Sequence, residues 1–219
     1  MPEQTIQPPF THRHEPAAVT PLTAAGRART IYNPKTGDYA TFLKSTEETG
    51  GESILIRVEL PAHAGTKMAR HIHLKSGETF VVTEGELTVE SGSDVIALKA
   101  GGTAFAGAGA HHRWYSTSDL PCVFEVDIRP AGRTEDGLRV IYGLARDGRS
   151  GPDSVPSNPL ELALGAQLSD IYLTTMPVWI QKAVFGLLAS IARMVGTEKR
   201  FAPYLDPETG FKPASTTAP

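Results

Sequence analysis

The sequence contains little cysteine, no uninterrupted long hydrophobic run and no cluster of basic residues. Its single cysteine, Cys122, excludes a disulfide framework within the chain, favours a cytoplasmic location and is interpreted as a small core residue. The longest apolar stretch, residues 178–195, is interrupted by Lys182 and Arg193 among others, so we expect no transmembrane span. The formal net charge is −3 over 219 residues, and we expect no nucleic-acid partner.

The two ends of the chain have the composition of segments without a core. Residues 1–27 are rich in proline and predict a flexible arm without the pattern of a signal peptide. His12 and His14 lie in this arm with no carboxylate partner nearby, and we interpret them as solvated. Residues 206–219 predict a disordered tail.

Between residues 28 and 130 the sequence has the pattern of a β-protein. Hydrophobic residues make up 40% of the chain and charged residues 21%, which is typical of a globular protein with a core. Short alternating segments separated by glycine, Asn-Pro and Ser-Gly turns predict a mainly β fold, a barrel or jelly roll. The expected strands are 30–32, 39–43, 53–60, 69–73, 78–83, 86–90, 95–98, 102–106, 113–116 and 123–128.

After residue 130 the hydrophobic period changes to that of helices, which predicts a C-terminal helical extension over 131–205. We expect a first helix that Thr134 caps, a linker over 148–157, a second helix over 160–173 and a third that begins at Pro177. The third helix should pack on the barrel or on a second subunit of a homodimer, with a membrane surface as the alternative. Its expected apolar face comprises Ile180, Val184, Leu187, Leu188, Ile191, Met194 and Val195.

A His-x-His pair followed by a glutamate carries the strongest chemical signal. Residues two apart on a strand share a face, so His71 and His73 can both enter the barrel while Ile72 points outward. Residues 75–77 can turn the chain, and Glu78 then begins a returning strand within reach of both rings. Imidazole and carboxylate groups suit one divalent Fe, Mn, Ni, Cu or Zn ion.

A second pair of histidines, His111 and His112, lies further along the chain. One of them can complete a site of three histidines and one glutamate if its strand pairs with the strand of His71 and His73. Each of these motifs alone is more often a solvated surface feature than a ligand. Together, on predicted strands with glycines at the required turns, they predict metal binding.

The first motif resembles that of the cupins, whose pattern is Gly, five residues, His-x-His, three or four residues, Glu, six residues and Gly. The second cupin motif is Gly, five residues, Pro-x-Gly, two residues, His, three residues and Asn. Here Gly107 replaces the proline and Ser116 the asparagine, and the spacing selects His112 over His111. The matching positions are Gly65, His71, His73, Glu78 and Gly85 in the first motif, and Gly101, Gly107, Gly109, His112 and Ser116 in the second.

The resemblance covers residues 50–128 and implies a single cupin barrel, a double-stranded β-helix. It also implies that three histidines and one glutamate hold a metal inside the barrel. These implied ligands are His71, His73, Glu78 and His112. The resemblance says little about the reaction, because cupins serve many chemistries.

Alternation along the strands predicts the walls of the pocket. Phe80 and Val82 should point inward with Glu78, and Trp114 and Ser116 with His112. These side chains either line an apolar substrate pocket or only fill the barrel. His111 should lie at the rim, as an acid or base for the reaction or as a solvated residue.

The site favours an enzyme, a metal-dependent oxygenase of the dioxygenase type acting on a small aromatic, enol or diketone molecule. Glu78 can serve as a catalytic base if it detaches from the metal. The alternatives are a non-redox metal-dependent isomerase or lyase, and a non-catalytic barrel that binds or senses a small molecule. The complete ligand set favours an enzyme over a pure binding barrel. Whether the helices cap the barrel mouth or cover its outer face stays open.

Overall fold

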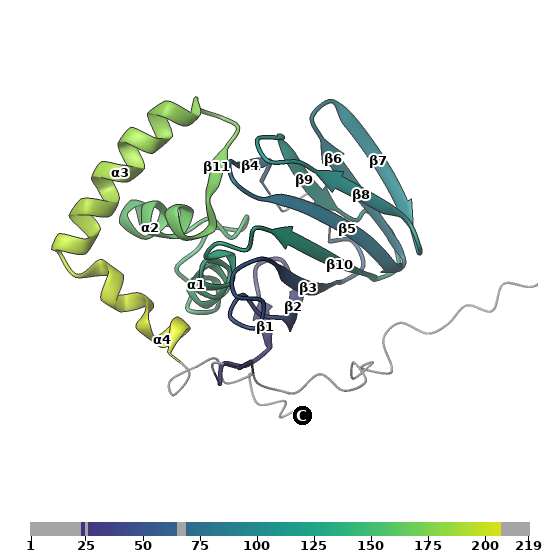
Figure 1. Ribbon diagram of the computed structural model, residues 1–219, viewed down its shortest axis with the longest axis horizontal. Coiled ribbons are helices and arrows are strands. Elements are labelled where there is room, and N and C mark those ends of the chain that lie inside the picture. Colours follow the sequence, from purple (N-terminus) through teal and green to yellow (C-terminus); the bar gives the residue numbers. More distant parts are fainter. Residues whose placement is uncertain (1–22, 25, 65–68, 207–219) are drawn as a thin grey trace, which may run out of the picture.

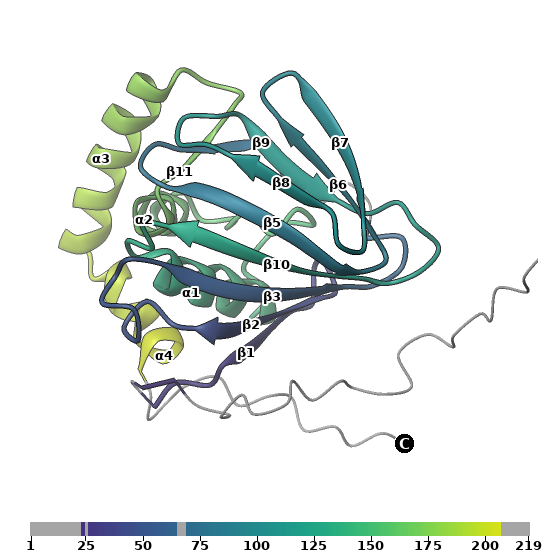
Figure 2. The same ribbon diagram turned by 45° about the vertical axis from the view of Figure 1, so that its right-hand side comes forward.

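A computed structural model describes residues 23–24, 26–64 and 69–206 (Figure 1). The expectations for His12, His14, Gly65 and the tail after residue 206 lie outside these described residues. Two antiparallel sheets form the larger part of the described chain, and helices stand at one side of them (Figures 1 and 2). The prediction of a mainly β jelly-roll barrel with C-terminal helices is confirmed.

The first sheet has six strands in the order β1-β2-β3-β10-β5-β8. Its strands alternate between the core and the surface, as β3 shows: Ile54, Ile56 and Val58 are buried, and the residues between them are only half-buried. This alternation gives the sheet one apolar face that packs into the barrel. The strands are β1 (Thr30–Asn33), β2 (Asp38–Lys44), β3 (Ile54–Leu60), β5 (Gly77–Glu84), β8 (Thr103–Ala106) and β10 (Cys122–Arg129).

The second sheet has five strands in the order β11-β4-β9-β6-β7. Ten of the eleven described strands match the predicted ones, with boundaries that differ by at most two residues. Only β11 was not predicted as a strand. The strands are β4 (His71–His73), β6 (Glu86–Ser91), β7 (Asp94–Lys99), β9 (His112–Tyr115) and β11 (Ile171–Leu173).

Large side chains from both sheets fill the barrel. Phe42, Phe80, Phe124 and Leu87 are almost fully buried in one continuous core. Cys122 belongs to the same core, and burial together with the nearby Glu86 raises the pKa of its thiol to about 12. It is therefore a small core residue, as expected, and not an activated nucleophile.

The helical extension begins one residue away from the predicted cap. Thr134 is the first helical residue, and Arg133 occupies the cap position without a side-chain hydrogen bond, so the prediction of Thr134 as the cap was wrong. The second helix has a capping asparagine, since Asn158 accepts a hydrogen bond from the Leu160 amide at 2.9 Å. The elements are α1 (Thr134–Arg146), α2 (Pro159–Ser169), α3 (Val178–Met194), a 3-10 helix (Thr197–Phe201) and α4 (Ala202–Leu205).

The second helix ends four residues earlier than predicted. Asp170 adopts a left-handed conformation, with φ of 51°, and stops α2 at Ser169. The next three residues, Ile171–Leu173, pair with β4 as strand β11. Branched and aromatic side chains favour a strand where the unpaired edge of a sheet is available. This edge exists only in the folded chain, so the local sequence does not predict β11.

The third helix buries only part of the predicted face: Ile180, Leu188 and Ile191 are half-buried, and Leu188 packs on the core. Gln181, Ala189 and Ala192 are buried, whereas Leu187 and Met194 are 64% and 79% exposed. The Gln181 amide exchanges hydrogen bonds with the backbone of Leu173, so polar contacts orient the helix. By length and composition, no single helix of the described residues can cross a membrane; one pair bent by 85°, α3 with residues 197–205, passes that test.

We predict that Gly85→Ala destabilises the barrel strongly. Gly85 turns the chain between β5 and β6 with φ of 76°, and an added Cβ would lie 2.4 Å from the Pro121 carbonyl oxygen. The expected loss in free energy of unfolding is more than about 2 kcal/mol, measured by urea denaturation. Gly92 is the control, because it has a similar φ of 61° with nothing within 4 Å of an added Cβ. Gly92→Ala should cost only about 1 kcal/mol, and equal losses in both variants would contradict the steric argument.

Candidate metal centre

Four side chains from both sheets meet at one end of the barrel. His71 and His73 lie on β4, and His112 lies on the neighbouring strand β9 directly opposite His71. Glu78 lies on β5 in the other sheet, which the chain reaches after the turn that follows β4. All four side chains are buried. The structure therefore brings together the four residues that the sequence singled out as ligands.

The potential ligand atoms of this group lie within 4.8 Å of one another. One oxygen of Glu78 is 3.1 Å from Nε2 of His73, and the other is 3.2 Å from Nε2 of His112. The rings of His71 and His112 are 4.4 Å apart between centroids. A group of this kind can bind a metal ion.

Backbone hydrogen bonds fix the orientation of all three imidazole rings. Nδ1 lies 2.9 Å from the Ala69 carbonyl in His71, and 3.0 Å from the Ala110 carbonyl in His112. In His73 the partner is the Ser169 carbonyl, also at 3.0 Å. A carbonyl oxygen only accepts, so each Nδ1 donates its proton. In a neutral ring this leaves the lone pair on Nε2, which faces the centre of the group.

The pKa values of the group reflect competition between burial and contact. Burial raises the pKa of Glu78, but the hydrogen-bonding contacts of this carboxylate with His112 and His73 lower the pKa by more, so the pKa of Glu78 lies well below its usual range. For His73, burial is opposed by the contact with Glu78, and the pKa rises. Burial and the neighbouring rings of His73 and His112 lower the pKa of His71 to about 3. The contacts with His112 and His73 thus favour the anionic form of Glu78.

The donor set fits a divalent metal ion. Nε2 of His112 is buried and has no hydrogen-bond partner of suitable geometry in the described part of the chain. With its Nδ1 protonated, a neutral ring turns a lone pair towards the oxygens of Glu78, which also carry lone pairs. Two acceptors at this distance repel each other, and a proton or a metal ion between them removes the repulsion.

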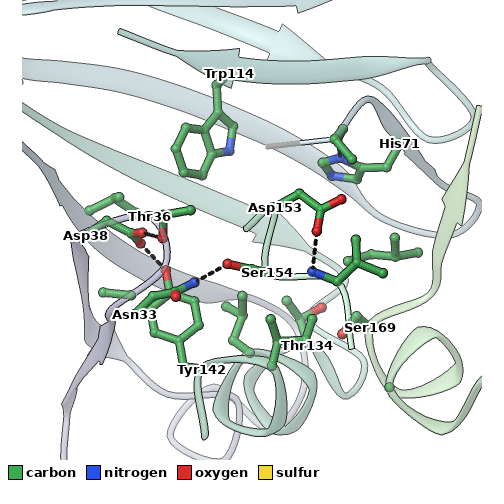
Figure 3. A pocket seen from close by; sticks show the side chains of 18 of the residues that line it. Asn33, Thr36, Asp38, His71, Trp114, Thr134, Tyr142, Asp153, Ser154 and Ser169 are labelled. Carbon is green, nitrogen blue, oxygen red and sulfur yellow. Dashed lines mark hydrogen bonds between the residues drawn. The ribbon is translucent and has the colours of Figure 1, made fainter. Parts of the chain in front are cut away.

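A cavity of about 190 Å³ adjoins the group and extends from the barrel to the helical extension. Its walls are mainly apolar, and they include Trp114 from the barrel and Leu138 and Leu162 from the extension. Figure 3 shows Trp114 and His71 above the cavity and residues of the extension below it. The extension therefore covers the mouth of the barrel, which answers the question that the sequence left open.

Polar groups lie at the side of the cavity away from His71 (Figure 3). The Tyr142 hydroxyl and the Thr36 hydroxyl both donate to the carboxylate of Asp38. Asn33 donates to Ser154 at 2.9 Å. Burial and the charge of Asp38 raise the pKa of Tyr142 well above its ordinary value, so this phenol stays protonated.

The predicted pocket residues occupy different places. Trp114 lines the cavity. Phe80, Val82 and Ser116 are buried but are not among the lining residues, and the two apolar side chains fill the barrel core instead. His111 is exposed. The ring centroids of Phe80 and Phe124 are 6.2 Å apart in the barrel core. The cavity extends in another direction, toward the helices.

Sequence patterns alone left open whether the extension contributes to the cavity. Leu138, Ile141 and Tyr142 follow helical spacing on α1. This spacing predicts that their side of the helix is buried, but it does not identify the structure against which that side packs. The Ser169 carbonyl that holds His73 is a backbone group, and no residue pattern identifies it.

Several solved structures are similar to part of this chain. A predicted oxalate decarboxylase of Thermotoga maritima is 22% identical, with 42% of this chain and 80% of that chain covered and a TM-score of 0.39. A protein of Thermus thermophilus is 25% identical, with coverage of 45% and 88% and a TM-score of 0.40. A sugar phosphate isomerase of Silicibacter pomeroyi is 24% identical, with coverage of 42% and 59% and a TM-score of 0.36.

No curated protein matches the chain. The family model of the cupin domain matches residues 57–129, which include all four residues of the group that could hold a metal ion. The same residues form strands of both sheets of the barrel. The chain is therefore a cupin-domain protein, with the domain over residues 57–129.

Proposed function

We propose that this protein is a metal-dependent oxygenase that acts on a small organic molecule. One observation carries the proposal: three imidazole Nε2 atoms and the Glu78 carboxylate converge beside an apolar cavity of about 190 Å³. A site with four protein ligands leaves coordination positions for further molecules. The cavity provides room for an organic substrate next to them.

The proposed ligands of the ion are His71, His73, Glu78 and His112. A bound Fe, Mn, Ni or Cu ion supplies redox chemistry and open coordination positions, whereas Zn supplies Lewis acidity alone. The fixed Nδ1 protons keep the three rings in the orientation that ligation needs.

The side chains of the cavity select and orient the substrate. Trp114 offers a flat apolar surface beside the ligands, which suits an aromatic, enol or diketone molecule. The leucines and isoleucines of α1 and α2 limit the access of water. Glu78 is anionic in the buried site, so it can accept a proton from the substrate if it leaves the metal.

We predict that His73→Ala removes the metal. Wild-type protein purified without a histidine tag should contain about one equivalent of a redox metal, and the variant should bind it at least about 100-fold more weakly. Elemental analysis measures the content, and oxygen uptake with enol and aromatic substrates then tests the reaction. His111→Ala is the matched control, since this neighbouring histidine is exposed and outside the group.

The outcomes of this experiment separate the functions. Zinc as the sole metal in active protein would contradict the oxygenase and favour a non-redox isomerase or lyase. Wild-type protein that holds no metal even after reconstitution would contradict both, and would leave a barrel that binds a small molecule by shape.

We predict that metal affinity rises with pH and then levels off. The pKa of His73 lies above its ordinary value of 6.5, so below that pKa a proton must leave the ring before a metal binds. Affinity should fall by up to about tenfold per pH unit below the pKa of His73 and stay constant above it. Competition with a chelator between about pH 5 and pH 9, corrected for protonation of the chelator, measures this. A constant affinity over the whole range would argue against His73 as a ligand.

We also propose that the protein forms a homodimer through the exposed apolar side of α3. Trp179, Leu187 and Met194 are 73%, 64% and 79% exposed, which is unusual for side chains of this size. Self-association is the commonest way to cover such a surface.

Leu187→Glu should shift the protein from dimer to monomer, because a charge in an apolar interface loses its hydration without gaining a partner. Sedimentation velocity measures the change. Lys182→Glu is the control on the same helix, since Lys182 is exposed and lies over the ring of Tyr172, and this variant should stay dimeric. A wild-type protein that sediments as a monomer at all concentrations would contradict the proposed dimer.

A further inference from the structure

The three ring-orienting hydrogen bonds of the metal-binding group differ in origin. His71 and His112 each donate to a carbonyl two residues earlier in the chain, from Ala69 and Ala110. His73 instead donates to Ser169, which is 96 residues away at the end of α2. Ser169 lies outside residues 57–129, the part that matches the cupin family model. One ligand is therefore oriented by the helical extension and not by the barrel.

The strand after Ser169 holds β4 along its whole length. Ile171 pairs with His73, and Leu173 pairs with His71. This antiparallel pairing fixes the distance between the extension and the two histidines. The position of the Ser169 carbonyl beside His73 is therefore fixed by the register of the sheet and not by a flexible loop.

Asp170 connects the extension to the turn that follows β4. Its carboxylate accepts a hydrogen bond from the Lys75 amide at 2.9 Å. Lys75 lies between His73 and Glu78, so this contact restrains the segment that brings the two ligands together. The extension thus contacts the ligand-bearing segment at the ring of His73, along β4 and at the turn.

The position of Ser169 is set in turn by α1. Gly137 on α1 lies so close that an added Cβ would be 1.8 Å from Oγ of Ser169, 2.9 Å from its Cβ and 3.1 Å from its backbone nitrogen. Rotation of the hydroxyl relieves only the first of these contacts. Any larger residue at position 137 therefore displaces the backbone that carries the accepting carbonyl.

We propose that Ser169 and Gly137 are positioning residues of the metal centre, and that the helical extension is an integral part of that centre. The Ser169 carbonyl holds His73 with Nε2 directed at the ligand group, and Gly137 allows the helices to approach closely enough for this. The inference rests on the proposed metal binding at the group. Hydrogen-bond partners of ligand imidazoles typically change metal affinity by 10- to 100-fold when they are lost.

The test uses Co²⁺ as the probe metal and the full chain. Gly137→Ala should weaken Co²⁺ binding by about 10-fold or more, measured by chelator competition, and should change the visible spectrum of the bound ion. In metal-free protein, ¹⁵N spectra of the imidazoles should show a protected Nδ1 proton on His73 that Gly137→Ala loses or shifts. The second readout requires no metal.

Gly143→Ala is the matched control on the same helix. An added Cβ there would lie 2.3 Å from the ring of Tyr204, so the variant also creates a steric clash on α1, but with Tyr204 and not with Ser169. It should lower the melting temperature while its Co²⁺ affinity stays within about twofold and the His73 signal is retained. Equal loss of Co²⁺ binding in both glycine variants would reduce the effect to general destabilisation and overturn the proposal.

A second variant keeps the inference testable if Gly137→Ala does not fold. Asp170→Gly tolerates the left-handed backbone but removes the acceptor for Lys75, and it should weaken Co²⁺ binding. Asp170→Asn retains an acceptor oxygen and should restore affinity. Unchanged Co²⁺ affinity and an unchanged His73 signal in Gly137→Ala, or in Asp170→Gly if the former is unfolded, would overturn the proposal. If wild-type protein binds no Co²⁺, the proposed metalloenzyme function is contradicted, whereas the imidazole signals still decide whether Ser169 positions His73.

Discussion

Three imidazole rings and one carboxylate face one another inside an apolar barrel, and this concentration of buried polar groups is the constraint around which the structure is organised. Burying an uncharged polar group without a hydrogen bond costs on the order of 2–7 kcal/mol, and burying an unpaired ionised carboxylate costs far more. Backbone carbonyls satisfy the Nδ1 side of every ring, and Glu78 contacts two of the Nε2 atoms. When the rings are neutral, their Nε2 lone pairs and those of the Glu78 oxygens face one another, and a cation stabilises such an arrangement.

The sequence predicted the barrel and the four clustered residues because both follow from local geometry. Period-two alternation and turn glycines determine where strands begin and end, and ten described strands lie where these signals placed them. The same period puts His71 and His73 on one face. The choice of His112 over His111 did not follow from alternation alone; it came from the resemblance to the cupin motif. The pairing of His71 with His112 then supplies its physical reason.

The remaining features depend on contacts between distant segments. Local propensity allows a helix over 160–173, but Ile171–Leu173 instead completes the edge of β4. Several large apolar side chains of α3 are exposed, whereas Gln181 is buried and binds the backbone of Leu173. Alternation placed Phe80 inward correctly, yet only the tertiary structure shows that it packs on Phe124 while the cavity extends toward α1 and α2.

The helical extension both lines the cavity and orients His73. Binding of a small molecule in the cavity is therefore linked to the geometry of the four clustered residues. Residues of α1, α2 and β11 line the cavity, and the junction between α2 and β11 orients His73. A ligand that displaces α2 would also move the Ser169 carbonyl and so change the ring that it holds. Conversely, an ion that fixes His73 would favour the arrangement of α2 in which the hydrogen bond is intact. The same segment thus lines the cavity and holds the ring of His73, although Ser169 and His73 are almost a hundred residues apart.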